Sequence, residues 1–400
     1  MTPPTDSPLP TTDAASPVRE RGEPSTGAPG VGRLIGLDLA RGLAVFGMYA
    51  VHVGPAPGQG GVIGFLMELA QGRSSALFAV LAGFAVALIT GRRTPKTGPA
   101  GRQAVAKVII RAVILMALGT ALTLTGTPVV PILAFYGLFF LLVLPLYRLG
   151  TKPLALIAVG WALVGPQLLY ALKPVFGGRV FLSYGQADGP VSLFFTGGYP
   201  ALTWVPFVIA GMAVARCDLA ATAVRIRLAL TGVALAVTGY GGSWLALRLV
   251  PGAAEAVRKA EEGPGMSSVS PDSIGIFGDT PAGMLASAPH SEATLSIVAA
   301  TGVAVLVITA CLAAMDAFPR LRRLARPVIA VGSMSLTAYV YHIVAIWLLD
   351  TEEATVQPLY VLLGFIASVT VLATVWSRFF RRGPLEWLMG RATRIARRIR

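Results

Sequence analysis

Long apolar runs, separated by short polar or basic connections, dominate the chain from residue 34 onward. A helix needs about 20 predominantly apolar residues to cross the hydrocarbon core of a bilayer. We count ten runs near this length, at approximately residues 34–54, 74–90, 104–125, 129–147, 153–172, 200–215, 228–249, 293–314, 328–349 and 357–380. The pattern predicts an all-α integral membrane protein with about ten transmembrane helices.

The basic residues predict an orientation for these spans, because positively charged connections are retained in the cytoplasm. If the N-terminus lies inside, the inner segments carry 26 of the 33 Lys and Arg residues, the outer segments carry 6, and Arg41 lies within a span. The outer segments also carry 11 of the 19 Asp and Glu residues. Both termini are therefore predicted to be cytoplasmic, and the net charge of +14 reflects topology rather than a nucleic-acid partner.

Composition supports the membrane class, since 54% of the residues are hydrophobic and only 13% are charged. Residues 1–32 are rich in Pro, Thr, Ser and Gly and are predicted to form a disordered cytoplasmic tail. Residues 33–383 form the predicted transmembrane domain, and the basic tail at 384–400 is expected to lie on anionic lipid headgroups. The two cysteines form no metal-binding pattern, so no metal is expected. Arg outnumbers Lys 28 to 5 and Asn is absent, which indicates a GC-rich bacterial genome, and we expect a multi-pass protein of the plasma membrane.

The first span, "GLDLARGLAVFGMYAVHVG", is interrupted by Asp38, Arg41 and His52. A charged residue at the centre of a membrane helix costs roughly 2.5 to 3.5 kcal/mol on insertion scales, so such residues usually face protein or an aqueous cavity. At about 100° per residue the three side chains fall within an arc of roughly 60°, and Arg41 and His52 are about 16 Å apart along the axis. We therefore predict one polar face, with the Asp38 and Arg41 end toward the cytoplasm and His52 toward the outside. The alternative is an i, i+3 ion pair whose Arg reaches the lipid phosphates, together with an ordinary hydrogen-bonded histidine at the interface.

Two pairs of residues at the ends of the second span are further candidates. Arg73 and Ser74 open this span at the outer face, where the positive-inside rule disfavours an arginine. Arg73 is a candidate oxyanion or substrate contact, and the alternative is an arginine anchored to headgroups. Arg92 and Arg93 follow the span on the inner side, where they are candidate contacts for an anionic cofactor, although topology alone also explains a basic loop there.

The other two histidines lie in different settings. His342 falls in the outer half of the ninth span with Tyr339 one helical turn before it. We weigh two interpretations of His342: it lines the same outer cavity as His52, or it makes a hydrogen bond in the core. His290 lies in a long polar loop and is expected to be solvated.

Three segments resemble those of transmembrane acyltransferases. The run "LDLARGLAVFGMYAVH" resembles the first helix of the acyltransferase-3 group, which has an Arg, ten residues and then a His, and of the heparan-alpha-glucosaminide N-acetyltransferase group with its bacterial YeiB-like (DUF418) relatives. The segment "GRSSALFAVLAGFAVAL" is similar to their second helix, and "GSMSLTAYVYHIVAIW" to their penultimate span. These segments cover about 50 of the 400 residues, and the first two favour the glucosaminide acetyltransferase and YeiB-like side.

The resemblance implies an acyltransferase that moves an acyl group, acetyl above all, from cytosolic acyl-CoA to an extracytoplasmic glycan, lipid or small molecule. His52 would then deprotonate the acceptor or carry the acyl group, Asp38 would orient Arg41, and Arg41, Arg92 and Arg93 would bind the CoA phosphates. The partners implied are the bilayer and the acceptor, and the oligomeric state is left open as a possible homo-oligomer.

Two other functions fit the same sequence. A transporter or exporter of a small molecule or lipid would also use ten spans and an intramembrane Asp–Arg pair, but neither inverted repeats nor paired broken helices are visible in the sequence. The third possibility is a membrane scaffold that shares the fold without catalysis.

Overall fold

The structure, a computed structural model, describes residues 35–127, 129–176, 191–261, 281–349 and 357–399. The described segments contain helices, turns and loops but no β-strand, so the predicted all-α class is confirmed. The tail predicted at residues 1–32 lies outside the described residues. The tail predicted at 384–400 contains a short α-helix, followed by a 3-10 turn at Thr393–Arg398.

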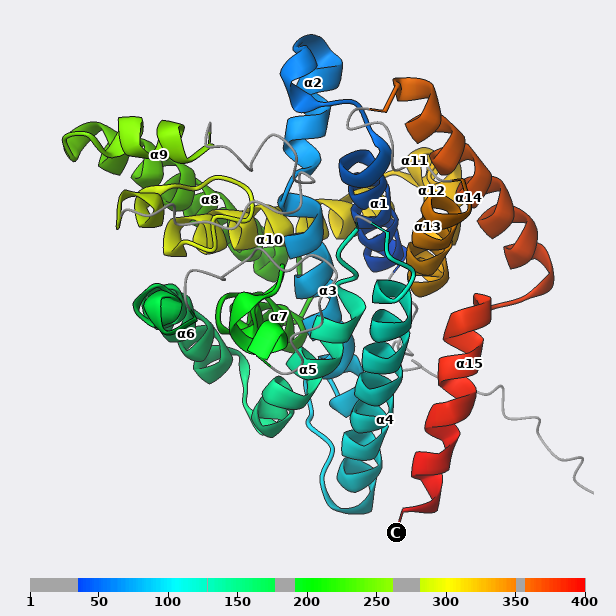
Figure 1. The fold of residues 1–400 in the computed structure, drawn as a ribbon. Helices are drawn as coiled ribbons and strands as arrows, with labels where there is room; N and C mark the ends of the chain where they lie inside the picture. The colour runs from blue at the N-terminus through cyan, green and yellow to red at the C-terminus, as the bar shows by residue number, and fades with distance from the viewer. Residues whose placement is uncertain (1–34, 128, 177–190, 262–280, 350–356, 400) are drawn as a thin grey trace, which may run out of the picture. The chain divides into compact units, whose positions relative to one another are not determined.

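Figure 1 shows the helices in chain order. They are α1 (Ile35–Val53), α2 (Gly61–Ala70), α3 (Arg73–Thr90), α4 (Gly98–Thr123), α5 (Leu133–Val143), α6 (Thr151–Leu172), α7 (Ala201–Arg216), α8 (Thr222–Leu249), α9 (Ala253–Glu261), α10 (Thr294–Ala317), α11 (Pro319–Leu324), α12 (Arg326–Ser333), α13 (Ser335–Leu349), α14 (Leu359–Phe379) and α15 (Pro384–Ala392). Each of the ten apolar runs found in the sequence is helical over most of its length.

Membrane-crossing length can be judged for the described helices. Six are long and apolar enough to cross a bilayer: the α2–α3 pair taken together, α4, α6, α8, α10 and α14. A seventh is added if α12 and α13 count as one broken span. The helices α5 and α7 are apolar but shorter, and α1 carries two charges within its 19 residues. The chain is therefore a multi-pass membrane protein, while the count of ten and the orientation stay predictions.

Two local features differ from the sequence pattern. The first predicted outer connection is not simply a loop, because it contains α2, which stacks end to end on α3 in Figure 1. The run at 328–349 is not one straight helix, because α12 and α13 meet at an angle of 85° around Met334. An apolar run of the right length shows that a segment belongs in the membrane, but it does not show where the segment bends.

Glycines allow two pairs of helices to cross at backbone contact. A Cβ built on Gly332 of α12 would lie 1.7 Å from the carbonyl oxygen of Asp38 on α1, and one on Gly83 of α3 would lie 1.9 Å from that of Val208 on α7. The short helix α7 is buried along nearly its whole length, whereas α8 buries only Gly232, Gly239 and Ser243, and its other residues are partly or fully exposed. The interior therefore centres on α1, α3 and α7, and the two ends of α1 and α3 carry the candidate site residues.

Candidate functional site

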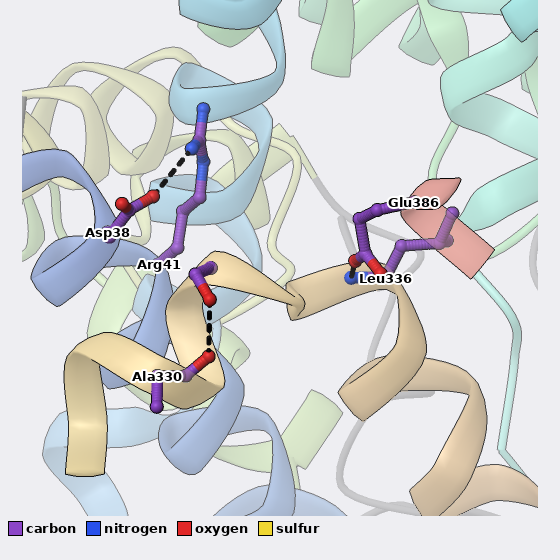
Figure 2. A network of polar contacts seen from close by, with 6 residues as sticks. Asp38, Arg41, Ala330, Leu336 and Glu386 are labelled. Atoms are coloured by element: carbon purple, nitrogen blue, oxygen red, sulfur yellow. Dashed lines mark hydrogen bonds and ion pairs between the residues drawn. The ribbon is translucent and has the colours of Figure 1, made fainter. Parts of the chain in front are cut away.

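Asp38 and Arg41 form an ion pair on the first turns of α1, as the i, i+3 spacing predicts. Arg41 Nη1 donates to Asp38 Oδ1 at 3.1 Å, and the Asp38 side chain is 7% exposed against 23% for Arg41. Figure 2 shows the pair beside the turn of α12 that contains Ala330. The Ser333 hydroxyl donates to the Ala330 carbonyl oxygen at 2.8 Å at the end of this helix. The backbone of α1 at Asp38 is pressed against Gly332, so α12 holds this turn of α1 in place.

Two further arginines, Arg111 and Arg382, lie near Arg41 at this end of α1. Arg111 on α4 has Arg382, Arg41 and Glu386 as its charged neighbours. The carboxylate of Glu386 accepts a hydrogen bond from the backbone N–H of Leu336 at 2.8 Å (Figure 2). The end of the bundle that is predicted to face the cytoplasm therefore concentrates positive charge, with the acid Glu386 placed at the start of α13.

The histidines at the other end of α1 meet across 290 residues of sequence. His52 Nδ1 and His342 Nε2 are 2.9 Å apart, and the two rings stack with centroids at 5.1 Å and an interplanar angle of 7°. One nitrogen donates and the other accepts, depending on the tautomers. His342 is fully buried and His52 is partly exposed, so the pair offers one accessible base backed by an inaccessible partner.

Two tyrosines hold His342 in place. The ring of Tyr49 lies 4.8 Å from the His342 ring, and the ring of Tyr339 lies 5.0 Å from it in an edge-to-face contact. The Tyr49 hydroxyl donates to the carbonyl oxygen of Ala338 at 2.7 Å, and the Tyr339 hydroxyl accepts from the Ile132 N–H at 3.0 Å. Tyr339, a predicted substrate contact, is 2% exposed and uses its hydroxyl to join α13 to the start of α5.

Arg73 and Ser74 lie in the same region but away from the histidine pair. Arg73 donates from Nε to the Tyr240 hydroxyl and from Nη1 to the Glu68 carbonyl oxygen, both at 2.7 Å, and its guanidinium lies 5.1 Å from the Tyr240 ring centroid. Ser74 is buried, and a Cβ on Gly47 of α1 would lie 1.9 Å from its hydroxyl. Arg73 is thus docked against α8, and Ser74 marks the crossing of α1 and α3.

Arg92 and Arg93 lie at the opposite end of α3. Arg92 Nε donates to the Ala215 carbonyl oxygen at 3.3 Å near the end of α7, and Arg93 pairs with Asp218 at 3.0 Å. Burial, together with the charge of Arg93, lowers the pKa of Arg92 from its usual value. Arg92 therefore joins the end of α3 to the last turn of α7, and Arg93 joins it to the segment after α7.

His290 and Glu292 form a buried group that the sequence did not indicate. The expectation that His290 is solvated is wrong: it is 6% exposed, and its ring stacks on Trp204 with centroids 5.7 Å apart. Glu292 is 4% exposed, and its carboxylate accepts from Trp204 Nε1 at 2.8 Å and from the Thr203 hydroxyl. Burial raises the pKa of Glu292 to about 7. A loop has no hydrophobic periodicity from which burial could be predicted. The one indication in the sequence was that the acidic residue Glu292 lies directly before a span.

The group lines a small cavity. Its walls include Gln71, Arg73, Trp204, Tyr240, His290 and Glu292, and its volume is about 30 Å³. Such a space accommodates a water molecule or two, and it is too small for a sugar ring. Both His290 and Glu292 have positive φ angles, 53° and 55°, which non-glycine residues rarely adopt. The loop is therefore held in a specific strained conformation against α7.

Comparison with known families divides the chain into two matched regions. Residues 33–239 match the family model described as heparan-alpha-glucosaminide N-acetyltransferase, catalytic, and residues 282–396 match the model described as protein of unknown function (DUF418). No curated protein matches the chain. The described residues hold no cluster of three or more histidine, cysteine or acidic side chains that could bind a metal ion. The first match contains Asp38, Arg41 and His52, and the second contains His342 and Glu386.

Proposed function

The chain belongs to the heparan-alpha-glucosaminide N-acetyltransferase catalytic family, and from that premise we propose that it transfers an acyl group, acetyl above all, from cytosolic acyl-CoA to an extracytoplasmic acceptor. The acceptor is a glycan, a lipid or a small molecule that presents an amine or hydroxyl group. The protein acts in the plasma membrane, where donor and acceptor lie on opposite sides.

The observation that carries this proposal is that the cationic group and the accessible histidine lie at opposite ends of α1. A cation, Arg41, lies near one end, and the accessible member of the His52–His342 pair lies about 16 Å away at the other. An extended pantetheine arm can cover such a distance while its phosphates stay at the arginine end. The two ends then bind the donor and activate the acceptor without sharing a surface.

His52 acts as the general base in this mechanism. Its accessible imidazole accepts the proton of the acceptor amine or hydroxyl while the acceptor nitrogen or oxygen attacks the thioester carbonyl carbon. The C–S bond then breaks and releases CoA. The proton then passes from the imidazolium to the leaving thiolate. His342, bonded to His52 at 2.9 Å, sets the tautomer and orientation of the His52 ring.

The donor site uses the positive charge at the other end. Arg41, paired with Asp38, attracts the CoA phosphates together with Arg111 and Arg382, and Arg92 and Arg93 extend this positive charge around the end of α3. On the acceptor side, Arg73 and Ser74 at the start of α3 are the predicted contacts, and Tyr339 supports His342 by an edge-to-face ring contact.

The test is turnover of acetyl-CoA by the purified protein with a panel of amine and hydroxyl acceptors. We expect His52→Ala to lower kcat by about 10²- to 10⁴-fold. Arg41→Ala should raise KM for acetyl-CoA, whereas the exposed Arg320→Ala should match the wild type. Unchanged turnover in both site variants would refute the site. Label that stays on the protein after single turnover, is released by hydroxylamine as an acylimidazole is, and is absent from His52→Ala would instead show that His52 carries the acyl group.

One observation favours a transporter as the second candidate. The α12–α13 pair is a broken span, and transporters build substrate sites from broken helices. In transporters such helices occur in pairs related by internal symmetry, and the described residues contain one bent pair. Uptake of a labelled solute by reconstituted vesicles without acetyl-CoA turnover would favour this candidate.

A further inference from the structure

The break between α12 and α13 leaves the first turn of α13 without a local cap. The residue at the break, Met334, has no side-chain oxygen that could accept from the first N–H groups of the new helix. The first N–H groups of a helix have no intrahelical acceptor, so these donors need a partner from elsewhere in the chain or from solvent.

Glu386 supplies that partner from α15. Its Oε1 accepts from the N–H groups of Leu336 at 2.8 Å and Thr337 at 3.2 Å, and its Oε2 accepts from the Thr337 hydroxyl at 2.7 Å. The Thr337 hydroxyl accepts in turn from the Leu385 N–H at 3.1 Å. The carboxylate therefore uses both oxygens to join the starts of α13 and α15, as Figure 2 shows for the Leu336 contact.

The backbone beside this junction is packed closely enough to transmit its position. A Cβ built on Gly383 would lie 2.5 Å from Cβ of Met334 and 2.2 Å from Oε2 of Glu386. The segment before α15 thus lies directly against the bend. Neither element can shift without changing the carboxylate contacts.

The same helix carries His342 six residues after Leu336, about 9 Å further along the axis. Between these positions, α13 is held by the Tyr49 bond to Ala338 and by the Tyr339 bond from Ile132. The Glu386 contacts are the anchor at the start of the helix, and the two tyrosines are the anchors in its middle. The ring of His342 meets His52 only while α13 keeps this rotation.

We propose that Glu386 is a positioning residue for the acyl transfer: its carboxylate caps the broken helix α13 and so holds His342 against His52. The inference rests on the proposed function for its kinetic readout, but the geometry can be tested without turnover. The carboxylate is a charged neighbour of Arg111, which also has Arg41 and Arg382 as neighbours. Glu386 therefore links the end of the molecule that carries Arg41 to the end that carries the His52–His342 pair, through the single helix α13.

The kinetic experiment compares Glu386→Gln, Glu386→Asp and the control Glu255→Gln, which removes an exposed ion pair with Arg258. A misplacement of about 1 Å at a reacting group can lower a rate by about 10²-fold. We expect Glu386→Gln to lower kcat by about 10- to 100-fold with KM for acetyl-CoA within about threefold of wild type. Glu386→Asp should retain intermediate activity, and Glu255→Gln should match wild type.

The geometric experiment uses a protein with His52→Cys and His342→Cys, in which Cys217 and Cys311 are replaced by alanine. Replacing both imidazoles with the smaller cysteine side chain opens a space beside the partly exposed position 52, through which a short bifunctional thiol-reactive reagent should reach and join the two positions. The yield should fall at least threefold when Glu386→Gln is added. Unchanged cross-linking together with unchanged kcat would overturn the inference while leaving the His52 test intact. If Glu386→Gln fails to fold, Glu386→Asp takes its place in both experiments. If the wild-type protein shows no acetyltransferase activity but Glu386→Gln still lowers the cross-linking yield, the positioning role is supported and the proposed function is refuted.

Discussion

The crossing of α1 and α12 allows a quantitative prediction for Gly332→Ala. The added methyl carbon would lie 1.7 Å from the Asp38 carbonyl oxygen and 2.7 Å from its carbonyl carbon. Real Cβ atoms do not approach other atoms below 3.0 Å, so the two backbones must separate by at least the missing 1.3 Å. Because both sides of the contact are helical backbone, no side chain can rotate to relieve it.

The expected cost has two parts. Overpacking of a well-packed contact costs about 1 to 3 kcal/mol, and the better helix propensity of alanine returns about 1 kcal/mol at most. The displaced α12 also carries α13, so His342 should move away from His52 by a distance comparable to the shift. From the sensitivity of catalysis to such misplacement, we expect turnover to fall by about 10²-fold.

Thermal unfolding in detergent and acetyl-CoA turnover, both measured against Gly364→Ala, test this reasoning. Gly364 is a helical glycine of α14, and a methyl carbon added to it would meet no neighbouring atom within 4 Å, so its variant gains helix propensity without a clash. Gly332→Ala should unfold at a lower temperature than this control. Its turnover should also be reduced at temperatures well below its own unfolding temperature, where the protein is still folded. Equal unfolding temperatures and equal turnover would show that the helices are not in backbone contact here.

Three further outcomes are expected. The pKa of Glu292 is about 7 in the folded protein, against 4.5 for an ordinary glutamate. Between these two pH values the folded protein keeps a proton that the unfolded chain releases. The free energy of unfolding should therefore fall by about 3 kcal/mol as the pH rises from 4.5 to 7. Glu292→Gln should remove this pH dependence of the unfolding temperature. Arg93→Ala, which breaks an exposed ion pair, should cost under about 1 kcal/mol in stability yet raise KM for acetyl-CoA, whereas Arg92→Ala should also lower the unfolding temperature; equal KM values would argue against phosphate contacts. Tyr49→Phe, which removes the bond that the Tyr49 hydroxyl adds to the helical Ala338 carbonyl oxygen, should destabilise the protein by about 0.5 to 1.5 kcal/mol and reduce kcat, and an unaltered kcat would separate this anchor from catalysis.

Much of the candidate site follows from local sequence. The spacing of Asp38, Arg41 and His52 places them on one face of a helix, since side-chain direction along a helix repeats every 3.6 residues. The ion pair between Asp38 and Arg41 is a direct result of i, i+3 spacing. The proximity of His342 to His52 was one of two open interpretations, because nothing in the intervening 290 residues specifies which helices are neighbours.

The sequence by itself determined that this is an all-α membrane protein. A helical protein crosses a bilayer with long apolar helices, and nearly every apolar run of this chain is long enough to form one. It also determined the polar face of α1, because helical periodicity is a local property. Only the tertiary structure decided where the span at 328–349 breaks, that Glu386 caps the new helix from 50 residues away, and that His290 and Glu292 are buried. These features depend on which surfaces meet after folding, and close packing between distant segments leaves no periodic trace in either of them.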